Sequence, residues 1–484
     1  MSRVSQRKRI QRIGARTGLL ASVLTLVCGC AAVRVPKLAT PMPRHWRNQP
    51  AASGAPAPDL NHWWKAFGDP RLDQLVAQSL KSNLDVAQAV ERLRAVRALY
   101  AHADAPFLPS LDFRTGHPVD PDASASYFTL GFDAQWELGL FGRRKAAERA
   151  AQGHLDTFVA DLRQSRVSLV AEVVRNWIDL RAAEHELGLM KHIRDARKAN
   201  LQRISVRVKL GLDAPRAQAE ARAALADAEA ALSVPRARAN AAAQRLALLL
   251  GRSEPASSWF AAGTLPALGS RDIQSVPADL LRTRPGIARA EADVLQATAA
   301  LGMARAKMYP DIGIGGSLVW STSTITHKRY EFNYIGSLGP VISLPLFDWG
   351  MRQAQAHARD HQLKASVLAY RKAVLQGIAD VETALGNLNQ QRAREKANEQ
   401  AVKALGQAAG QQAERVHLGL ASDIEQANSM ITRDKARQAL VEARAARDIA
   451  YVALYKALGG APIADLGTTK GSNDGTAVAP VGSR

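Results

Sequence analysis

Cysteine, long apolar runs and the short motifs of enzyme active sites are all scarce in this sequence. The two cysteines, Cys28 and Cys30, lie near the amino terminus, so the rest of the chain has no disulfide framework and no cysteine-based metal site. No segment approaches the roughly eighteen consecutive apolar residues of a membrane-spanning helix, so we expect a membrane to be crossed only by strands of a closed barrel. The glycine-rich phosphate loop and the Gly-x-Ser-x-Gly turn are also missing. We therefore expect neither an enzyme nor a cofactor or metal site.

The first 29 residues have the pattern of an export signal. Basic residues come first, and the apolar run 19–27 follows, whose nine residues are too few to span a bilayer permanently. The run ends in Leu-Val-Cys-Gly-Cys, which resembles a bacterial lipobox and makes Cys30 the predicted lipidated first residue of the mature chain. Ala31 follows in place of the Asp that retains lipoproteins at the inner membrane, which implies the outer membrane. A disulfide between Cys28 and Cys30 is the alternative, but one intervening residue would strain it.

The chain carries a net charge of +20, a value that would fit a nucleic acid partner. Six of the positive charges lie within the export signal, and the others are interleaved with Asp and Glu along helical stretches. We interpret the excess as solvated helix faces and expect no nucleic acid partner.

An internal repeat with a period of about 200 residues organises the chain. Five pairs of landmarks recur in the same order: 83–86 and 284–287, Pro109 and Pro310, 138–142 and 344–348, 207–212 and 415–420, and 250–251 and 458–459. Between the second and third landmarks of each copy the sequence becomes rich in Gly, Ser, Thr, β-branched and aromatic residues, which predicts strands at about 111–138 and 311–344. Each copy therefore contributes one β-hairpin.

A very long helix is predicted after each hairpin, over about 143–209 and 350–417, because these stretches have almost no proline. Each would extend roughly 100 Å. Apolar residues alternate at spacings of three and four, which is typical of coiled-coil packing. They are Leu155, Val159, Leu162, Leu169, Val173 and Leu180 in the first helix, and Val367, Val374, Ile378, Val381, Leu385 and Leu388 in the second.

Each long helix is expected to turn at a Gly-Leu pair and to be followed by a return segment. Ser422 and Glu425 form a predicted capping box at the start of the second return helix, and Asp213 is the cap candidate of the first. Pro235 must break or kink the first return segment.

Taken together, these landmarks resemble the TolC-like outer-membrane factors, in particular the lipoprotein branch that serves resistance-nodulation-division efflux systems (NodT-like). The resemblance covers nearly all of residues 30–461. Its motifs are Trp63-Trp64, Phe67-Gly68-Asp69-Pro70, Trp136-Glu137-Leu138-Gly139-Leu140-Phe141-Gly142-Arg143 and Leu344-Pro345-Leu346-Phe347.

The resemblance implies a mainly α fold with membrane β strands. Each chain of a homotrimer would give four strands to one twelve-stranded barrel, and its helical hairpins would form a periplasmic tunnel. Such a duct would passively release small amphipathic toxicants or drugs, which an inner-membrane pump and a periplasmic adaptor (membrane fusion) protein deliver. The chain would contact outer-membrane lipid and extend from the outer membrane into the periplasm.

The resemblance also implies roles for the tips of the helical hairpins. Adaptor contacts are expected at Leu210, Gly211, Leu212, Leu418, Gly419 and Leu420. Many relatives carry an acidic residue six positions beyond the tip glycine, where this chain has Ala217 and Glu425; nine positions beyond lie Glu220 and Asn428. Glu425, Glu220 and Asn428 are therefore candidates for a pore constriction. Glu425 as a capping residue only is the alternative.

The expected organisation is a signal peptide (1–29), a lipidated linker (30–60), a first repeat (61–264; strands about 111–138, helical hairpin about 143–251), a second repeat (265–461; strands about 311–344, helical hairpin about 350–459) and a disordered tail (462–484). Two other functions fit the same sequence. One is an outer-membrane duct for secreted proteins, and the other is a periplasmic coiled-coil structural lipoprotein that has no pore.

Overall fold

A computed structural model describes residues 33–38, 46–48, 59–116, 127–261, 263–268, 283–323 and 333–462. The export signal, Cys30 and the predicted tail beyond residue 462 lie outside the described residues. The strands are β1 (Ser110–Gly116), β2 (Tyr127–Glu137), β3 (Asp311–Ser323) and β4 (Asn333–Ser343). The helices are α2 (Pro70–Ser82), α3 (Leu84–Tyr100), α4 (Arg143–Lys209), α5 (Pro215–Ala231), α6 (Ser233–Leu249), α7 (Pro285–Ala306), α8 (Met351–His417) and α9 (Asp423–Leu458), with 3-10 helices at Trp63–Phe67, Ala105–Phe107 and Ser257–Phe260.

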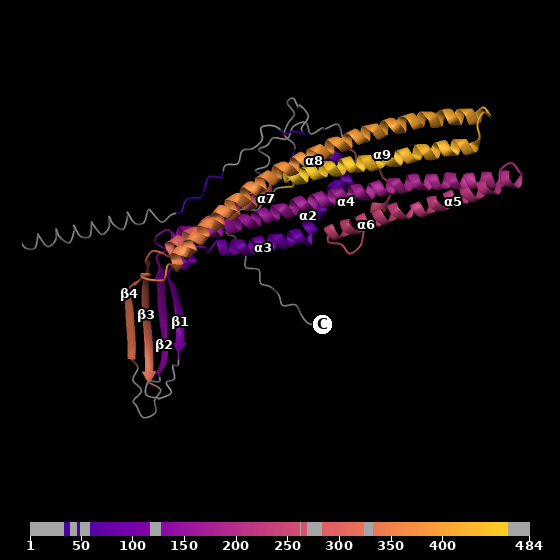
Figure 1. Ribbon diagram of the computed structural model, residues 1–484. Helices are drawn as coiled ribbons and strands as arrows, with labels where there is room; N and C mark the ends of the chain where they lie inside the picture. The colour runs from indigo at the N-terminus through magenta and orange to yellow at the C-terminus, as the bar shows by residue number, and fades with distance from the viewer. Residues whose placement is uncertain are drawn as a thin grey trace, which may run out of the picture.

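The molecule is long and bent, with the β-sheet projecting from one end of a layer of helices (Figure 1). Helices α4 and α8 have 67 residues each, so each spans roughly 100 Å. Both begin next to the sheet and run to the far tip, where the chain turns back. The two long helices and the two β-hairpins predicted from the repeat are therefore present at the expected positions.

The four strands form one antiparallel sheet in the order β1-β2-β3-β4. The hairpins of the two repeats meet in the middle, where β2 pairs with β3 and Trp136 lies opposite Ile314. Among the described residues, β1 and β4 each pair with only one strand, so both edges of this sheet are open there.

The helices form a layer that is four helices wide. Near the sheet the order across the layer is α3, α4, α7, α8, and towards the tip it is α5 and α6, then α4, α9, α8. Helix α4 is central at both levels, whereas α3 and α8 lie at the edges. The layer therefore has open edges on the same two sides as the sheet.

Two junctions with left-handed backbone connect the sheet to the long helices. Phe141 and Gly142 have φ values of 54° and 83°, and Trp349 and Gly350 have φ values of 56° and 80°. The two glycines precede the first residues of α4 and α8 and tolerate this region without steric cost. By backbone, Phe141 therefore corresponds to Trp349, although the repeated sequence motif aligns it with Phe347. The second junction is two residues longer.

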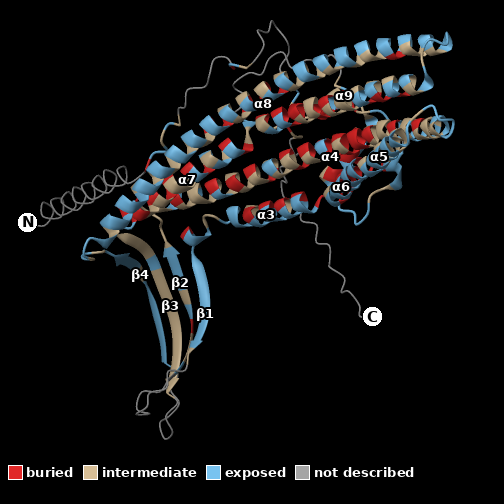
Figure 2. Cartoon of the chain, turned by 45° about the vertical axis from the view of Figure 1, so that its right-hand side comes forward, coloured by how far each residue is buried: buried red, intermediate tan, exposed pale blue. Residues whose placement is uncertain are grey.

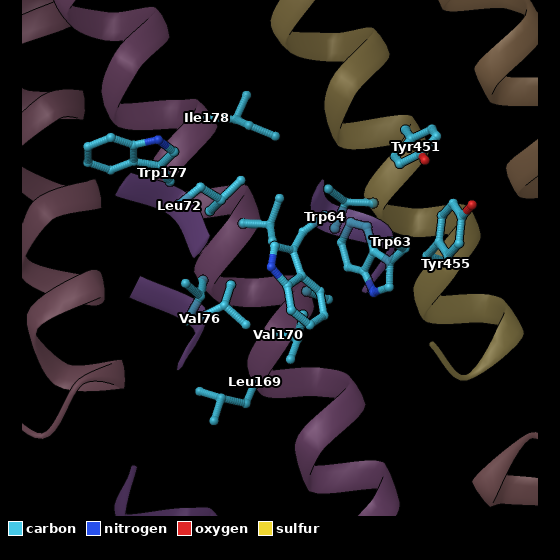
Figure 3. Close-up of a cluster of buried hydrophobic side chains, with 14 of the residues drawn as sticks. Trp63, Trp64, Leu72, Val76, Leu169, Val170, Trp177, Ile178, Tyr451 and Tyr455 are labelled. Atoms are coloured by element: carbon cyan, nitrogen blue, oxygen red, sulfur yellow. The ribbon is translucent and has the colours of Figure 1, made fainter. Parts of the chain in front are cut away.

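The core lies where the first aromatic motif meets the helices, away from both ends of the molecule (Figure 2). Trp63 and Trp64 lie between α9 and α4, and Trp63 stacks on Tyr455 with ring centroids 5.1 Å apart (Figure 3). Trp177 of α4 is buried, and its Nε1 donates to the carboxylate of Asp69 at 2.7 Å. Because Asp69 also caps α2, this bond fixes the short helix against α4.

The apolar positions predicted for the long helices are mostly buried. Leu162, Leu169, Val173 and Leu180 of α4 and Val374, Val381, Leu385 and Leu388 of α8 are buried, while Leu155, Val159 and Ile378 pack against the same core at partial burial. The spacing of three and four residues therefore identified the packed face.

Two of the three expectations for the return helices are confirmed. Ser422 and Glu425 form the capping box, with Glu425 N donating to Ser422 Oγ and Ser422 N donating to the Glu425 carboxylate. The helix containing Pro235 is broken at Leu232, between α5 and α6. The cap prediction for Asp213 was wrong: Ala214 occupies the cap position of α5, and Asp213 instead accepts two hydrogen bonds from Arg207.

We predict that Trp177→Ala destabilises the protein by about 3 to 5 kcal/mol, because it removes both a buried indole and the bond to Asp69. Trp177→Phe keeps most of the packing and should cost about 1 to 2 kcal/mol. Chemical unfolding of the purified protein in detergent would measure both. Equal losses for the two variants would show that the hydrogen bond, not the packing, is the main contribution.

Candidate functional site

One face of the β-sheet is predominantly apolar and largely exposed. Cross-strand neighbours on this face include Phe113 opposite Phe132, and Phe132 opposite Leu318. The rings of Phe113 and Phe132 lie 5.2 Å apart, and Leu338 of β4 is 83% exposed. The other members are Leu111, Phe128, Leu130, Trp136, Ile312, Ile314, Trp320, Tyr334 and Ile342. A continuous apolar surface of this size is typical of contact with lipid or another protein.

The opposite face of the sheet is largely polar, because successive side chains of a strand alternate between faces. Arg114 lies 3.6 Å from the Asp133 carboxylate and 3.9 Å from that of Asp112. The hydroxyls of Ser317 and Ser337 are 2.8 Å apart across β3 and β4. Apolar-out and polar-in alternation is the pattern of a strand with lipid on one side and water on the other.

Apolar side chains also occupy the open edges of the helical layer. On one side, Leu84 and Leu99 of α3 are exposed, and on the other side Leu368 and Leu375 of α8 are exposed. Among the described helices, none covers these leucines, so each edge of the layer presents exposed apolar side chains.

The two helical hairpins end in turns of the same geometry. Gly211 and Gly419 have φ values of 70° and 71°. After each glycine a leucine N–H bonds back five residues, from Leu212 to Arg207 O at 2.8 Å and from Leu420 to Arg415 O at 2.7 Å. This is a glycine-dependent helix C-cap. The four tip leucines, Leu210, Leu212, Leu418 and Leu420, are exposed.

The candidate constriction residues lie near these tips but are not gathered in one place within the chain. Glu425 is exposed and serves as the capping-box carboxylate of α9. Glu220 is exposed on α5 and pairs with Arg216 at 2.8 Å. Asn428 accepts from Asn200 at 3.2 Å and thereby joins α9 to α4.

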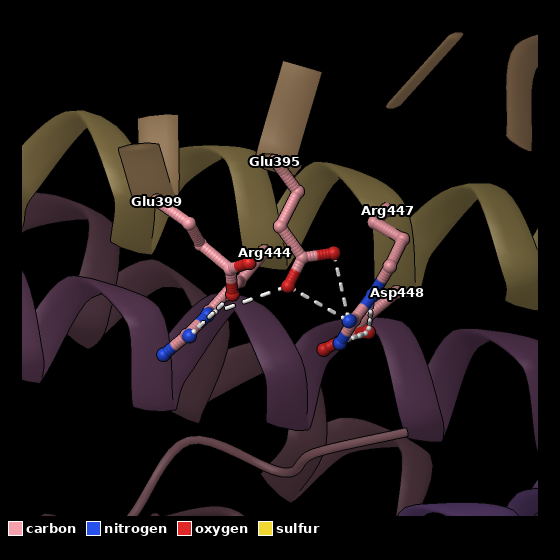
Figure 4. A network of polar contacts seen from close by, with 5 residues as sticks. All are labelled: Glu395, Glu399, Arg444, Arg447 and Asp448. Carbon is pink, nitrogen blue, oxygen red and sulfur yellow. Dashed lines mark hydrogen bonds and ion pairs between the residues drawn. The ribbon is translucent and has the colours of Figure 1, made fainter. Parts of the chain in front are cut away.

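A buried ionic cluster between α8 and α9 was not recognised in the sequence. Arg447 lies 2.8 Å from Glu395 and 2.6 Å from Asp448, and Arg444 bonds Glu399 at 2.8 Å (Figure 4). Asp448 is fully buried, and its second oxygen has no hydrogen-bond partner among the residues that the structure describes. Burial raises the pKa of Asp448 from 3.8 to about 7, although Arg447 opposes the shift. The sequence does contain a signal for this cluster, because the charged Asp448 lies at the helical spacing of the apolar residues Ala445 and Val452.

The segment that follows the predicted lipidation site is docked on the helical layer. The carbonyl of Val33 accepts from Arg149 on α4 at 2.8 Å. Further along, the Glu382 carboxylate of α8 accepts the backbone N–H of Arg47 at 2.6 Å and that of Asn48 at 3.1 Å, and Trp46 is buried. No sequence pattern indicated these contacts, because they are made by backbone groups, which do not depend on the type of residue.

Over the part of the chain that the structure describes, no helix has the length and apolarity of a membrane span. In the same residues, no group of three or more His, Cys, Asp or Glu side chains could hold a metal ion.

The sequence profile of the outer membrane efflux proteins matches residues 75–252 and 276–460. The chain belongs to this family. Nodulation protein T of Rhizobium leguminosarum bv. trifolii is 28% identical over 67% of this chain and 71% of its own length. The pyoverdine export outer membrane protein OpmQ of Pseudomonas aeruginosa is 27% identical over 86% of this chain and 91% of its own. The solved structure of the outer-membrane channel OprN superposes with a TM-score of 0.78 at 27% identity, covering 90% of this chain and 100% of that one.

OpmQ is named as an export protein of the outer membrane, and OprN as an outer-membrane channel. The chain is accordingly an outer-membrane efflux channel protein that extends into the periplasm. The family and the general function expected from the sequence motifs are therefore confirmed.

We predict that Asp448→Asn makes stability less dependent on pH. A raised pKa means that the native state holds a proton which the unfolded state releases, so the native state loses stability as pH rises from about 4 through 7. The loss amounts to about 1.4 kcal/mol for every pH unit that separates the folded-state pKa from the unfolded-state pKa. Asparagine cannot ionise, so the variant should melt at a higher temperature than wild type at pH 8 and with a smaller difference at pH 5.

Thermal unfolding in detergent at pH 5, 6, 7 and 8 would measure this. Glu399→Gln is the matched control, because Glu399 belongs to the same cluster but is about half exposed. The same pH dependence in wild type and Asp448→Asn would contradict the prediction.

Proposed function

We propose that this chain forms a homotrimeric, passive exit duct of a tripartite efflux pump, in which a periplasmic adaptor and an inner-membrane transporter deliver small amphipathic toxicants or drugs. The observation that carries the proposal is the pair of open edges. Within the described part of the chain, β1 and β4 have no further strand, and α3 and α8 no further helix, on their outer side. Because the two edges differ, copies must join head to tail, and a ring closes such a series.

Three copies with four strands each would give a barrel of twelve strands. The exposed apolar face would then contact outer-membrane lipid, and Arg114, Asp133 and Ser317 would line a watery lumen. Closure also pairs the backbone groups of β1 and β4, which lipid cannot satisfy. The helical layers of the copies would continue the ring into the periplasm as a tunnel.

The hairpin tips are the proposed contacts with the adaptor. Leu210, Gly211 and Leu212, and Leu418, Gly419 and Leu420, present two apolar turns of the same shape at the end most distant from the sheet. Exposed leucines beside a tight turn suit packing against helices of a partner. Around a threefold axis, Glu425, Glu220 and Asn428 would recur as rings near the same level, where carboxylates favour cations and narrow the passage.

The proposed lipid anchor at Cys30 fits the position of Val33. Three residues span at most about 11 Å, and Val33 bonds Arg149 in the second turn of α4, close to the sheet. Acyl chains on Cys30 would therefore enter the membrane at the level where the strands end. Several acyl chains would hold the protein firmly.

We predict that Leu99→Cys with Leu368→Cys yields covalent trimers on oxidation. Tyr100 bonds Gln152 on α4, Gln296 of α7 bonds Gly153, and Arg305 of α7 pairs with Asp360 of α8. Since α7 and α8 run in opposite directions, these contacts place Leu99 and Leu368 at one height on opposite edges. Non-reducing electrophoresis would detect the cross-link.

The matched control is Leu84→Cys with Leu368→Cys. Leu84 is exposed on the same helix as Leu99 but lies 15 residues away, about 22 Å along the axis. Only intramolecular products, or equal cross-linking by both pairs, would count against the proposed ring.

We predict that deletion of the gene lowers tolerance to at least one class of toxicant. Wild type should restore tolerance, Leu418→Asp with Leu420→Asp should fail to do so through loss of adaptor contact, and Cys30→Ser should restore it partly. Immunoblots of outer-membrane fractions control for abundance. Unchanged tolerance to a broad panel together with loss of a secreted protein would favour the secretion duct instead.

A further inference from the structure

The two junctions between the sheet and the long helices have the same backbone conformation, but their aromatic side chains differ in burial. Phe141 of the first junction is 8% exposed, whereas Trp349, at the equivalent left-handed position of the second junction, is 90% exposed. Phe347 is exposed beside it, with its ring 4.8 Å from that of Trp349. An aromatic pair of this size rarely stays in water without a partner.

The first junction shows which residues pack against an aromatic side chain at this left-handed position. Phe141 stacks on Tyr309, with ring centroids 5.1 Å apart and an interplanar angle of 12°. Close by, Leu138 N donates to Ile312 O at 3.1 Å, and Arg143 pairs with Asp311 at 2.7 Å. The first junction is therefore covered by the residues around Pro310, where the second hairpin begins.

The sequence repeat identifies the residues that would pack against Trp349 in the second junction. Pro310 matches Pro109 in the first copy, so Tyr309 corresponds to Leu108. Leu108 is 48% exposed, and Leu111 and Phe113 on β1 are more exposed still. Within one chain these residues lie on the β1 edge of the sheet, whereas Trp349 follows β4 at the other edge. The two surfaces can meet only between copies.

We propose that Trp349 and Phe347 dock against Leu108 and the start of β1 of a second copy, so that each second junction is completed by the neighbouring chain. The inference rests on the proposed homotrimer and deepens it by assigning the contact. The proposed contact between chains is equivalent to the packing of Phe141 against Tyr309 within one chain.

The same correspondence sets a strand register between copies. Within the chain Trp136 lies opposite Ile314 and Glu137 opposite Gly313. Their equivalents in the sequence repeat place Ile342 of one copy opposite Phe113 of the next, and Ser343 opposite Asp112. The first pair joins apolar faces and the second joins polar faces, so the alternation of the sheet continues across the interface. A shift by one residue would put each apolar side chain opposite a polar one.

The register is tested with Ile342→Cys and Phe113→Cys, because directly opposed residues have Cβ atoms about 5 Å apart. Oxidation of the trimer in membranes should link most chains. Leu338→Cys with Phe113→Cys is the control: Leu338 shares the apolar face of β4, but lies four residues, about 13 Å, out of the expected register. Cross-linking by the control pair in preference to the first would overturn the inference.

The docking of Trp349 is tested separately by variants at this position. Trp349→Ala should weaken association of the copies by about tenfold or more, as loss of a buried aromatic anchor does, while Trp349→Phe should retain most of it. Dissociation of purified trimers during dilution in detergent would be followed by light scattering. Unchanged association for Trp349→Ala would contradict the docking.

Fluorescence distinguishes a second copy from lipid as the cover. Wild type and Trp349→Phe are compared in bilayers that contain brominated phospholipid, and the difference isolates Trp349. Protection from the quencher is expected, and strong quenching would overturn the inference in favour of lipid. If wild type forms no trimer at all, the proposed function itself fails, whereas a trimer in which Trp349 is quenched contradicts only this inference.

Discussion

The backbone groups at the two open strand edges are the constraint on which the rest of the structure depends. An unpaired edge in lipid costs several kcal/mol for each unsatisfied group. In the described residues, β1 and β4 leave such edges on either side of a sheet that has one predominantly apolar face. A single chain can remove neither edge, because the two hairpins already use their inner strands to pair with each other. In the proposed assembly, further copies joined head to tail would pair with both edges.

In the proposed assembly, the duplication would let one type of contact form twice, once within a chain and once between chains. The contact of Phe141 with Tyr309 joins the two repeats within the chain, whereas Trp349, the counterpart of Phe141, is exposed. The same holds for the helical layer, in which α4 is covered on both sides but α3 and α8 are not. The repeats also differ in their return segments: the first is broken at Leu232 and the second is a single helix.

The long helices are held together by two unlike kinds of packing. Around Trp63, Trp177 and Tyr455 a large aromatic core fixes the helices to one another. Towards the tips, the contacts between the two hairpins include polar pairs, such as Asn200 with Asn428 and Arg203 with Asp423 at 3.6 Å. The cluster around Asp448 combines both kinds of packing, because it is buried like the core and ionic like the contacts near the tips.

The sequence by itself determined the elements: two hairpins, two long helices, their apolar stripes and the Ser422 capping box. Local periodicity and turn chemistry determine these features, and both depend on residues that are close together in the sequence. Only the tertiary structure decided that Asp213 pairs with Arg207, that Glu382 holds the segment after Cys30, and that Trp349 corresponds to Phe141. Each depends on residues brought together from distant parts of the chain or on backbone dihedral angles, neither of which a pattern of side chains encodes.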